Sequence, residues 1–260
     1  MRYNLQLGGN ILQAIDRISL ILEYLATHPS GATLSDIAEQ IGLAQSVVHR
    51  FLHALKKHSY VRQDSMTKKY ILSIKLFSLG AQVIKNNDIR RIARPHMECL
   101  CKKTKSFVFL CLFEQNIVVC IDTVQTDANV SFFVKIGSAM PINSSAAAQS
   151  IIAFLTPKEM ERIVNAEQLL PFTQKTLVEK EALLKRLETI RSEGFATCDE
   201  ELEPGVIGIS APIRNYDDAI VGSITILKSK ITEAVSQNFA EELKQTARLI
   251  SADLGNSTKN

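Results

Sequence analysis

The stretch from Gln45 to His58 presents a polar helix face that contains no acidic residue. Ordinary solvated helices mix both charge signs, so this face is expected to meet a polyanion. Arginine and glutamine can read base edges in the major groove, whereas lysines bind phosphates without sequence choice. The side chains predicted to reach bases or flanking phosphates are Gln45, Ser46, Val47, His49 and Arg50. The predicted phosphate-binding side chains are Lys56, Lys57, Arg62, Lys68 and Lys69.

A second candidate site is the run of small residues from Asn143 to Ala148, which precedes an apolar segment. If a helix starts in this run, its first backbone N–H groups have no partner within the helix and can bind a carboxylate. The same run is equally consistent with small residues that let a helix pack close to a sheet. The sequence leaves both interpretations open.

A third candidate is Cys198 beside the acidic cluster Asp199, Glu200 and Glu201, which could be catalytic or bind a metal. No nucleophile elbow, phosphate-binding loop, dinucleotide-binding or zinc-protease motif occurs, and His96 is the only histidine after residue 58. Metal ligation without a supporting histidine is poorly motivated, and we interpret Glu200 and Glu201 as a solvated turn. We therefore predict no catalytic residue, metal or cofactor, and keep an enzyme that uses Cys198 as an alternative.

Three helices are expected to position the acid-free face. The first is striped by Ile11, Ile15, Ile18, Leu22 and Leu25. Thr33 is expected to cap a second helix over residues 34–41, with Asp36 completing a capping box and Gly42 ending the helix. The third helix then begins near Gln45 and packs on the second through its apolar side.

Residues 60–64 and 69–72 are expected to pair as a β-hairpin around the polar turn at 65–68. Three helices followed by a hairpin are typical of the winged helix-turn-helix, which inserts its third helix into the major groove. We therefore assign residues 8–72 to a DNA-binding domain of this kind. A basic face on an ordinary helical bundle is the alternative.

The rest of the chain is predicted to be a linker helix at 73–88 and an α+β domain at 89–256. Expected helices cover 89–103, 144–155, 157–165, 177–193 and 234–254, and expected strands cover 107–113, 117–124, 130–136, 196–198, 206–213 and 219–227. This interleaving predicts one antiparallel sheet with helices packed on it. The linker helix carries an apolar stripe that predicts a dimer contact: Leu76, Phe77, Leu79, Val83 and Ile84.

Composition indicates a soluble, core-forming protein, with 46% hydrophobic and 22% charged residues among 260. The net charge is +3, but residues 1–86 hold ten Lys or Arg against five Asp or Glu, and residues 87–260 hold twenty against twenty-two. A basic first third suggests a module that meets nucleic acid. Five cysteines without a CxxC pair, no apolar run of membrane-spanning length and no signal peptide predict a cytoplasmic protein without disulfides.

The run "LSDIAEQIGLAQSVVHRFLHALKKHSYVRQD", followed by "KKYILSIKLFSLG", resembles the IclR family of bacterial transcriptional regulators. The resemblance continues in "IGSAMPINSSAAAQSIIAFL", "IRSEGFATCDEELEPGVIGISAPI" and "VGSITI". The segment "KKYILSIKLFSLGAQVIKNNDIRRIARPHM" is most similar to regulators of sugar-acid catabolism of the 2-keto-3-deoxygluconate type. The resemblance implies that residues 89–256 form a GAF-like effector-binding and oligomerisation domain.

The resemblance also implies an effector site. Family members that bind small 2-oxo acids use a helix start, which matches Ala146 and Ala147 here, and an acid, where this chain has Cys198 with Asp199 next to it. A cysteine is replaced by Gly208, and two serines are replaced by Thr225 and Leu227. Fewer polar groups than in those members favour a larger or less polar acid, such as a sugar acid or an aromatic acid. We expect that enlarging Ala147 to phenylalanine would fill this site.

The leading hypothesis is an effector-responsive repressor of a catabolic operon. It would bind double-stranded operator DNA as a homodimer or homotetramer and a small carboxylic acid in its C-terminal domain, without a membrane partner. The alternative from another class is a small-molecule-binding signalling protein whose winged helix docks a protein instead of DNA.

Overall fold

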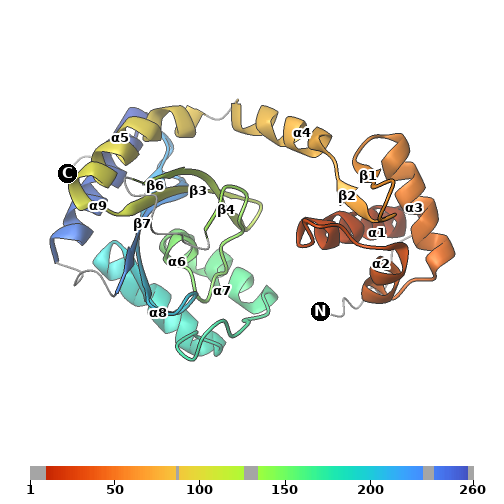
Figure 1. Cartoon of the computed structure of the whole chain (residues 1–260). Coiled ribbons are helices and arrows are strands. Elements are labelled where there is room, and N and C mark those ends of the chain that lie inside the picture. The colour runs from red at the N-terminus through yellow and green to blue at the C-terminus, as the bar shows by residue number, and fades with distance from the viewer. Residues whose placement is uncertain (1–9, 86–87, 126–133, 231–236, 257–260) are drawn as a thin grey trace. The chain divides into compact units, whose positions relative to one another are not determined.

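The computed structural model describes residues 10–85, 88–125, 134–230 and 237–256. The chain divides into two compact units, residues 1–86 and residues 87–260 (Figure 1). The division that we predicted at residue 72, between the winged helix and a linker, stays a prediction.

The N-terminal unit contains the predicted helices and hairpin. Its elements are α1 (Asn10–Ala26), α2 (Leu34–Ile41), α3 (Gln45–Lys57), β1 (Val61–Gln63), β2 (Tyr70–Leu72) and α4 (Ile74–Lys85). The antiparallel strands β1 and β2 pair with Val61 opposite Leu72 and Gln63 opposite Tyr70. The winged helix-turn-helix plan is therefore confirmed, with strands shorter than those we predicted.

Local signals set both ends of α2 as the sequence predicts. The Thr33 hydroxyl accepts a hydrogen bond from the Asp36 N–H at 3.2 Å, and the Asp36 carboxylate accepts one from the Thr33 N–H at 2.9 Å. Gly42 ends the helix in the left-handed region, with φ of 70°, where a residue without a Cβ is favoured. These caps determine where the chain turns toward α3.

The core of this unit differs from the predicted stripe in one place. On α1, Ile21 is fully buried and Leu25 nearly so, whereas Ile15 is 58% exposed. The apolar repeat therefore extends beyond the core at Ile15. On α3, Val48 and Leu52 are fully buried, as expected.

A five-stranded antiparallel sheet forms the centre of the C-terminal unit, in the order β4-β3-β7-β6-β5. Its strands are β3 (Phe107–Glu114), β4 (Ile117–Val124), β5 (Ala196–Asp199), β6 (Val206–Arg214) and β7 (Ile220–Ser229). The β3–β4 hairpin turns through Gln115 and Asn116, which both have positive φ. This sheet and the helices around it confirm the α+β class.

Helices cover both faces of this sheet (Figure 1). They are α5 (Asp88–Thr104), α6 (Ala146–Ile152), α7 (Pro157–Ala166), α8 (Lys180–Glu193) and α9 (Gln237–Asp253). Helices α5 and α9 share a core with one side of β3, β4, β6 and β7. Helices α6, α7 and α8 share a core with the other side of the sheet, which includes Ala196 and Cys198 of β5. Side chains alternate along a strand, so Ile226 faces α9 while Leu227 faces α6.

Three predicted elements need correction. Of the strand predicted at 130–136, residues 130–133 lie outside the described part and 134–136 form no strand; Ala139 instead bridges to Val119. The helix predicted at 144–155 is shorter, because α6 begins at Ala146 and ends at Ile152. The helix predicted at 177–193 begins later, because α8 begins at Lys180. The predicted residues 234–236 before α9 lie outside the described part, so that start stays a prediction.

Candidate DNA-binding face and ligand pocket

The N-terminal half of α3 presents its polar side chains to solvent. Ser46, His49 and Arg50 are exposed, and Val47 is half-buried. Gln45 is exposed too, and its amide donates to the Ser35 hydroxyl at 3.3 Å. Because the opposite side of α3 is packed against the core, this face has the freedom that insertion into a major groove requires.

The hairpin provides the second part of this face. The Asp64 carboxylate accepts hydrogen bonds from the backbone N–H groups of Met66 and Thr67, at 3.0 and 2.7 Å, which orders the turn. Lys68 is exposed immediately after this turn, and Lys69 is half-buried. Because the turn is already ordered, placing Lys68 beside a phosphate fixes little additional backbone.

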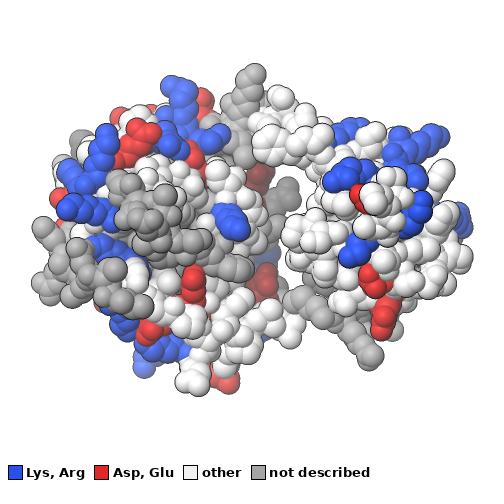
Figure 2. Space-filling view, in the orientation of Figure 1, with Lys and Arg blue, Asp and Glu red and all other residues white. Residues whose placement is uncertain are grey.

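Two further lysines lie at the far end of α3. Lys56 donates to the Gln63 side chain at 3.3 Å, which ties α3 to β1, and Lys57 is exposed. Figure 2 shows Lys and Arg gathered over the part of this unit where Figure 1 places α3 and the hairpin, while the acids in view lie mostly beside α2. The face is therefore electropositive, as a phosphate-binding surface must be.

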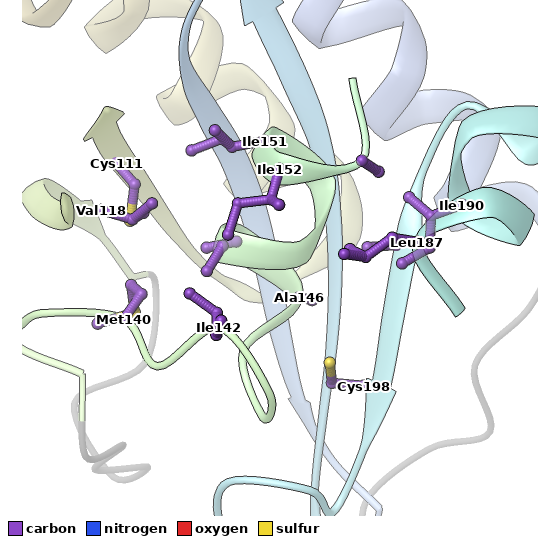
Figure 3. Packing of buried hydrophobic residues seen from close by; sticks show 14 of the residues in the cluster. Cys111, Val118, Met140, Ile142, Ala146, Ile151, Ile152, Leu187, Ile190 and Cys198 are labelled. Atoms are coloured by element: carbon purple, nitrogen blue, oxygen red, sulfur yellow. The ribbon is translucent and has the colours of Figure 1, made fainter. Parts of the chain in front are cut away.

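A pocket opens in the C-terminal unit between the start of α6 and the sheet. Its empty space, counted with the opening to solvent, is about 410 Å³. It is lined by Phe109, Val134, Met140, Ser144, Ser145, Ala146, Cys198, Glu201, Leu202, Glu203, Val206, Gly208, Thr225 and Leu227. Figure 3 shows the buried cluster to which this wall belongs, with Ile151 and Ile152 on α6 and Leu187 and Ile190 on α8. It also shows two of the lining residues, Ala146 and Cys198.

Four of the six predicted effector-binding residues line this pocket: Ala146, Gly208, Thr225 and Leu227. Ala147 is not among the described lining residues; it is fully buried, and its carbonyl accepts from the Ser223 hydroxyl of β7 at 3.2 Å. Phenylalanine at this position would therefore crowd the packing of helix on sheet, in contrast to what we expected.

Asp199 is the other predicted residue outside the pocket lining. Its carboxylate binds Lys230 at 2.9 Å on the outer side of β5. Glu200, the next residue, has φ of 61°, and this left-handed residue turns the chain so that Glu201 enters the pocket. Two acids therefore line the pocket, Glu201 and the half-buried Glu203. Our interpretation of Glu201 as part of a solvated turn is wrong, because Glu201 is only 5% exposed.

The hydroxyl groups beneath α6 are mostly bonded to one another. Thr225 donates to Ser210 at 2.8 Å, and Ser210 lies 2.8 Å from the Ser150 hydroxyl. The Ser144 hydroxyl differs, because it is buried and has no hydrogen-bond partner within the described part of the chain. Ser144 therefore offers the pocket a donor that the protein leaves unused.

The surroundings of Cys198 do not suit a nucleophile. Burial, and next the nearby Glu201 carboxylate, raise the pKa of the Cys198 thiol well above its ordinary value, whereas reactive cysteines have a lowered pKa. Lys175, the Gly205 N–H and Lys230 hold the pKa of Glu200 down to about 2. The acids beside Cys198 thus serve ion pairs and the pocket wall. This geometry does not support the alternative of an enzyme that uses Cys198.

The described part of the chain contains neither a metal-binding cluster nor a membrane-spanning helix. Within residues 10–85, 88–125, 134–230 and 237–256, no group of three or more His, Cys, Asp and Glu side chains is placed to hold a metal ion. None of the helices in these ranges combines the length and apolar character needed to cross a bilayer.

The two parts of the chain that carry the α3 face and the pocket match models of the same protein family. Residues 14–65 match the family described as "IclR helix-turn-helix domain". Residues 81–252 match "Bacterial transcriptional regulator IclR C-terminal". The chain belongs to the IclR family. As an IclR-family protein it is a DNA-binding transcriptional regulator, with the DNA-binding module and the pocket in different parts of one chain.

Individual relatives support the same assignment. The IclR-family chain is 29% identical to the transcriptional regulator KdgR of Escherichia coli K12 over 85% of each sequence, which is consistent with the resemblance to 2-keto-3-deoxygluconate-type regulators. It is 31% identical to the transcriptional repressor AllR of the same strain, over 94% of this chain and 90% of AllR. The fold also matches an IclR homolog of Microbacterium hydrocarbonoxydans complexed with 4-hydroxybenzoate, with TM-score 0.72, 22% identity, and coverage of 93% and 98%.

Proposed function

We propose that this IclR-family regulator is a cytoplasmic repressor of a catabolic operon that releases its operator when a small organic acid occupies the pocket. The observation that carries the proposal is the presence, in one chain, of an acid-free exposed α3 face and a pocket with an unpartnered buried hydroxyl. AllR, named as a repressor, and the homolog that holds 4-hydroxybenzoate support the two halves of the proposal.

The proposal assigns base recognition to the exposed residues of the first turns of α3, and phosphate binding to the lysines of α3 and the hairpin. It assigns effector binding to the pocket. The direct test is to sequence genomic fragments that the purified protein retains, and then to titrate organic acids against the complex. Retained fragments with a shared palindrome, released by an acid, would support the proposal. Failure to retain any DNA would favour a winged helix that docks a protein.

Replacing Lys68 with alanine is expected to weaken binding to operator and random DNA alike. A lost phosphate contact releases one counterion fewer, so the slope of log K against log salt should become shallower by about 0.9. The measurement is fluorescence anisotropy over a salt series, with the exposed Lys102→Ala of α5 as a matched control. An unchanged slope in Lys68→Ala would remove the hairpin from the binding face.

We also propose that the chain acts as a homodimer or homotetramer, because one winged helix reads only one half-site. Helix α4 supports this proposal, since Ile74 is 80%, Phe77 72% and Leu79 48% exposed, an apolar surface that water disfavours. Leu76 is half-buried, and the side chains of Val83 and Ile84 lie outside the described part.

The Phe77→Asp variant tests this assembly. It is expected to shift the protein toward monomers in light scattering at micromolar concentration and to weaken operator binding, because a charge would be buried in the contact. Tyr216→Asp, at an aromatic residue that is 70% exposed in the other unit, is the control. Unchanged mass and affinity in Phe77→Asp would place the dimer contact elsewhere.

A further inference from the structure

Glu201 is a buried carboxylate in the wall of the pocket. Its side chain is 6% exposed, and charged groups are rarely buried to this extent without partners. Arg186 of α8 donates to Oε1 at 3.3 Å, and Gln149 of α6 approaches Oε2 at 3.4 Å. Arg186 is not one of the described residues that line the pocket. The positive charge therefore balances Glu201 from behind and leaves the pocket side of the carboxylate available.

Acceptor capacity remains at this carboxylate. An ionised carboxylate accepts about four hydrogen bonds and donates none. The contacts from Arg186 and Gln149 are both at the long end of the hydrogen-bond range, and a thiol such as that of the nearby Cys198 is only a weak donor. On its pocket side, the Glu201 carboxylate can therefore accept a hydrogen bond from a donor group on a ligand.

The Ser144 hydroxyl independently indicates that a ligand belongs in this pocket. Ser144 is 1% exposed and lines the pocket, and its oxygen has no partner among the described residues. A buried hydroxyl left unpaired destabilises the folded protein, so a ligand that accepts a hydrogen bond from it removes this penalty. Ser145 lines the pocket next to it, and its side chain makes no capping hydrogen bond to α6 in the described structure.

The serine hydroxyls and the Glu201 carboxylate favour different groups on a ligand. Hydroxyls can donate to a ligand carboxylate, whereas Glu201 repels one inside a largely apolar space. A bound acid is therefore oriented, with its carboxylate beside Ser144 and Ser145 and another group beside Glu201. We propose that Glu201 selects effectors that carry a hydrogen-bond donor, a hydroxyl or an amino group, in addition to their carboxylate. The inference rests on the proposed function of the pocket as an effector site for organic acids.

The test uses acids that differ by a single donor. The aromatic set is benzoate, 4-hydroxybenzoate and 4-aminobenzoate, and the aliphatic set is hexanoate, 6-hydroxyhexanoate and 6-aminohexanoate. Kd values are measured by calorimetry on the full-length protein. In at least one set, the wild type is expected to bind a donor-bearing member about tenfold or more tightly than the plain acid, since hydrogen bonds to charged groups are strong. The hydroxy and amino arms then show which donor the site prefers.

The Glu201→Gln variant keeps the shape of the side chain and removes its charge. The preference for the donor-bearing acid is expected to fall to within about threefold, partly because the plain acid binds more tightly once the repulsion is gone. Glu193→Gln, on the exposed side of α8, is the matched control and should keep the wild-type ratio. Ser144→Ala should weaken both members of a pair by a similar factor and leave their ratio unchanged.

The outcomes separate the inference from the function on which it rests. Wild-type binding of plain and donor-bearing acids with equal affinity would overturn the role of Glu201, and so would a ratio unchanged in Glu201→Gln. If the wild type binds no member of either set, the proposed acid effector and the inference fall together. The ratio of Kd values for the plain and donor-bearing acids is measured on the wild type. It therefore tests the preference for a donor even if Glu201→Gln does not fold.

Discussion

Replacing Arg50 with alanine is expected to weaken operator binding by about 1–3 kcal/mol, which is roughly a 5- to 150-fold loss of affinity. Arg50 is exposed on the polar face of α3, while Val48 and Leu52 on the other side are buried in the core. The guanidinium can therefore reach the groove while the backbone of α3 is held in place. A bidentate contact with guanine contributes free energy of this size and is lost entirely in alanine.

The measurement is a gel-shift titration with the operator and with random DNA of the same length. Affinity for the operator should fall much more than affinity for random DNA, because a lost base contact removes discrimination. Arg248→Ala, an exposed arginine on α9, is the control and should behave as wild type. Equal losses on both DNAs would identify Arg50 as a phosphate contact, and no loss on either would refute the recognition-helix assignment.

Replacing Gly208 with valine is expected to abolish the ligand response while leaving operator affinity near the wild-type value. A Cβ at this position would lie 3.2 Å from Leu227 Cδ2 and 3.5 Å from the Ala146 Cβ. Both neighbours line the pocket, so the added side chain occupies space that a ligand needs. We expect a loss of ligand affinity of about 100-fold or more, with a cost in folding of about 1–3 kcal/mol from overpacking.

Calorimetry and ligand-induced release from DNA test this change together. Thr197→Val alters β5 on the side away from the pocket and controls for a general effect on the sheet. A thermal melt confirms that Gly208→Val remains folded at the assay temperature. A wild-type ligand response in Gly208→Val would place the effector site outside this pocket.

Local signals made the DNA-binding module predictable from the sequence. The capping box joins Thr33 to Asp36, and the N–H of Gly42 bonds to the carbonyls of Ala38 and Glu39, so each end of α2 depends on residues within four positions of one another. Local interactions of this kind act almost independently of the rest of the fold. The alternation along β7 is local in the same sense, and it places Thr225 and Leu227 on the same side of the sheet.

The sequence alone could not show which residues of a helix are buried in the core, exposed to solvent or part of the pocket lining. The apolar stripe of α1 does not show that Ile21 is buried while Ile15 is exposed, because that depends on where the other helices end. Near the small-residue run, Ala146 lines the pocket and Ala147 packs on the sheet. A shift of one residue in the helix register would place Ala147 where Ala146 now lines the pocket.

The position of Glu201 shows most clearly what the sequence determines and what the tertiary structure determines. The sequence by itself determined that three acids follow Cys198, and alternation along an extended strand would face Cys198 and Glu200 one way and Asp199 and Glu201 the other. The left-handed turn at Glu200, stabilised by the Gly205 N–H and by Lys175 and Lys230, breaks that alternation. These partners are 5 to 30 residues away along the chain. Only the tertiary structure, by bringing them to Glu200, decided that Glu201 enters the pocket with Cys198.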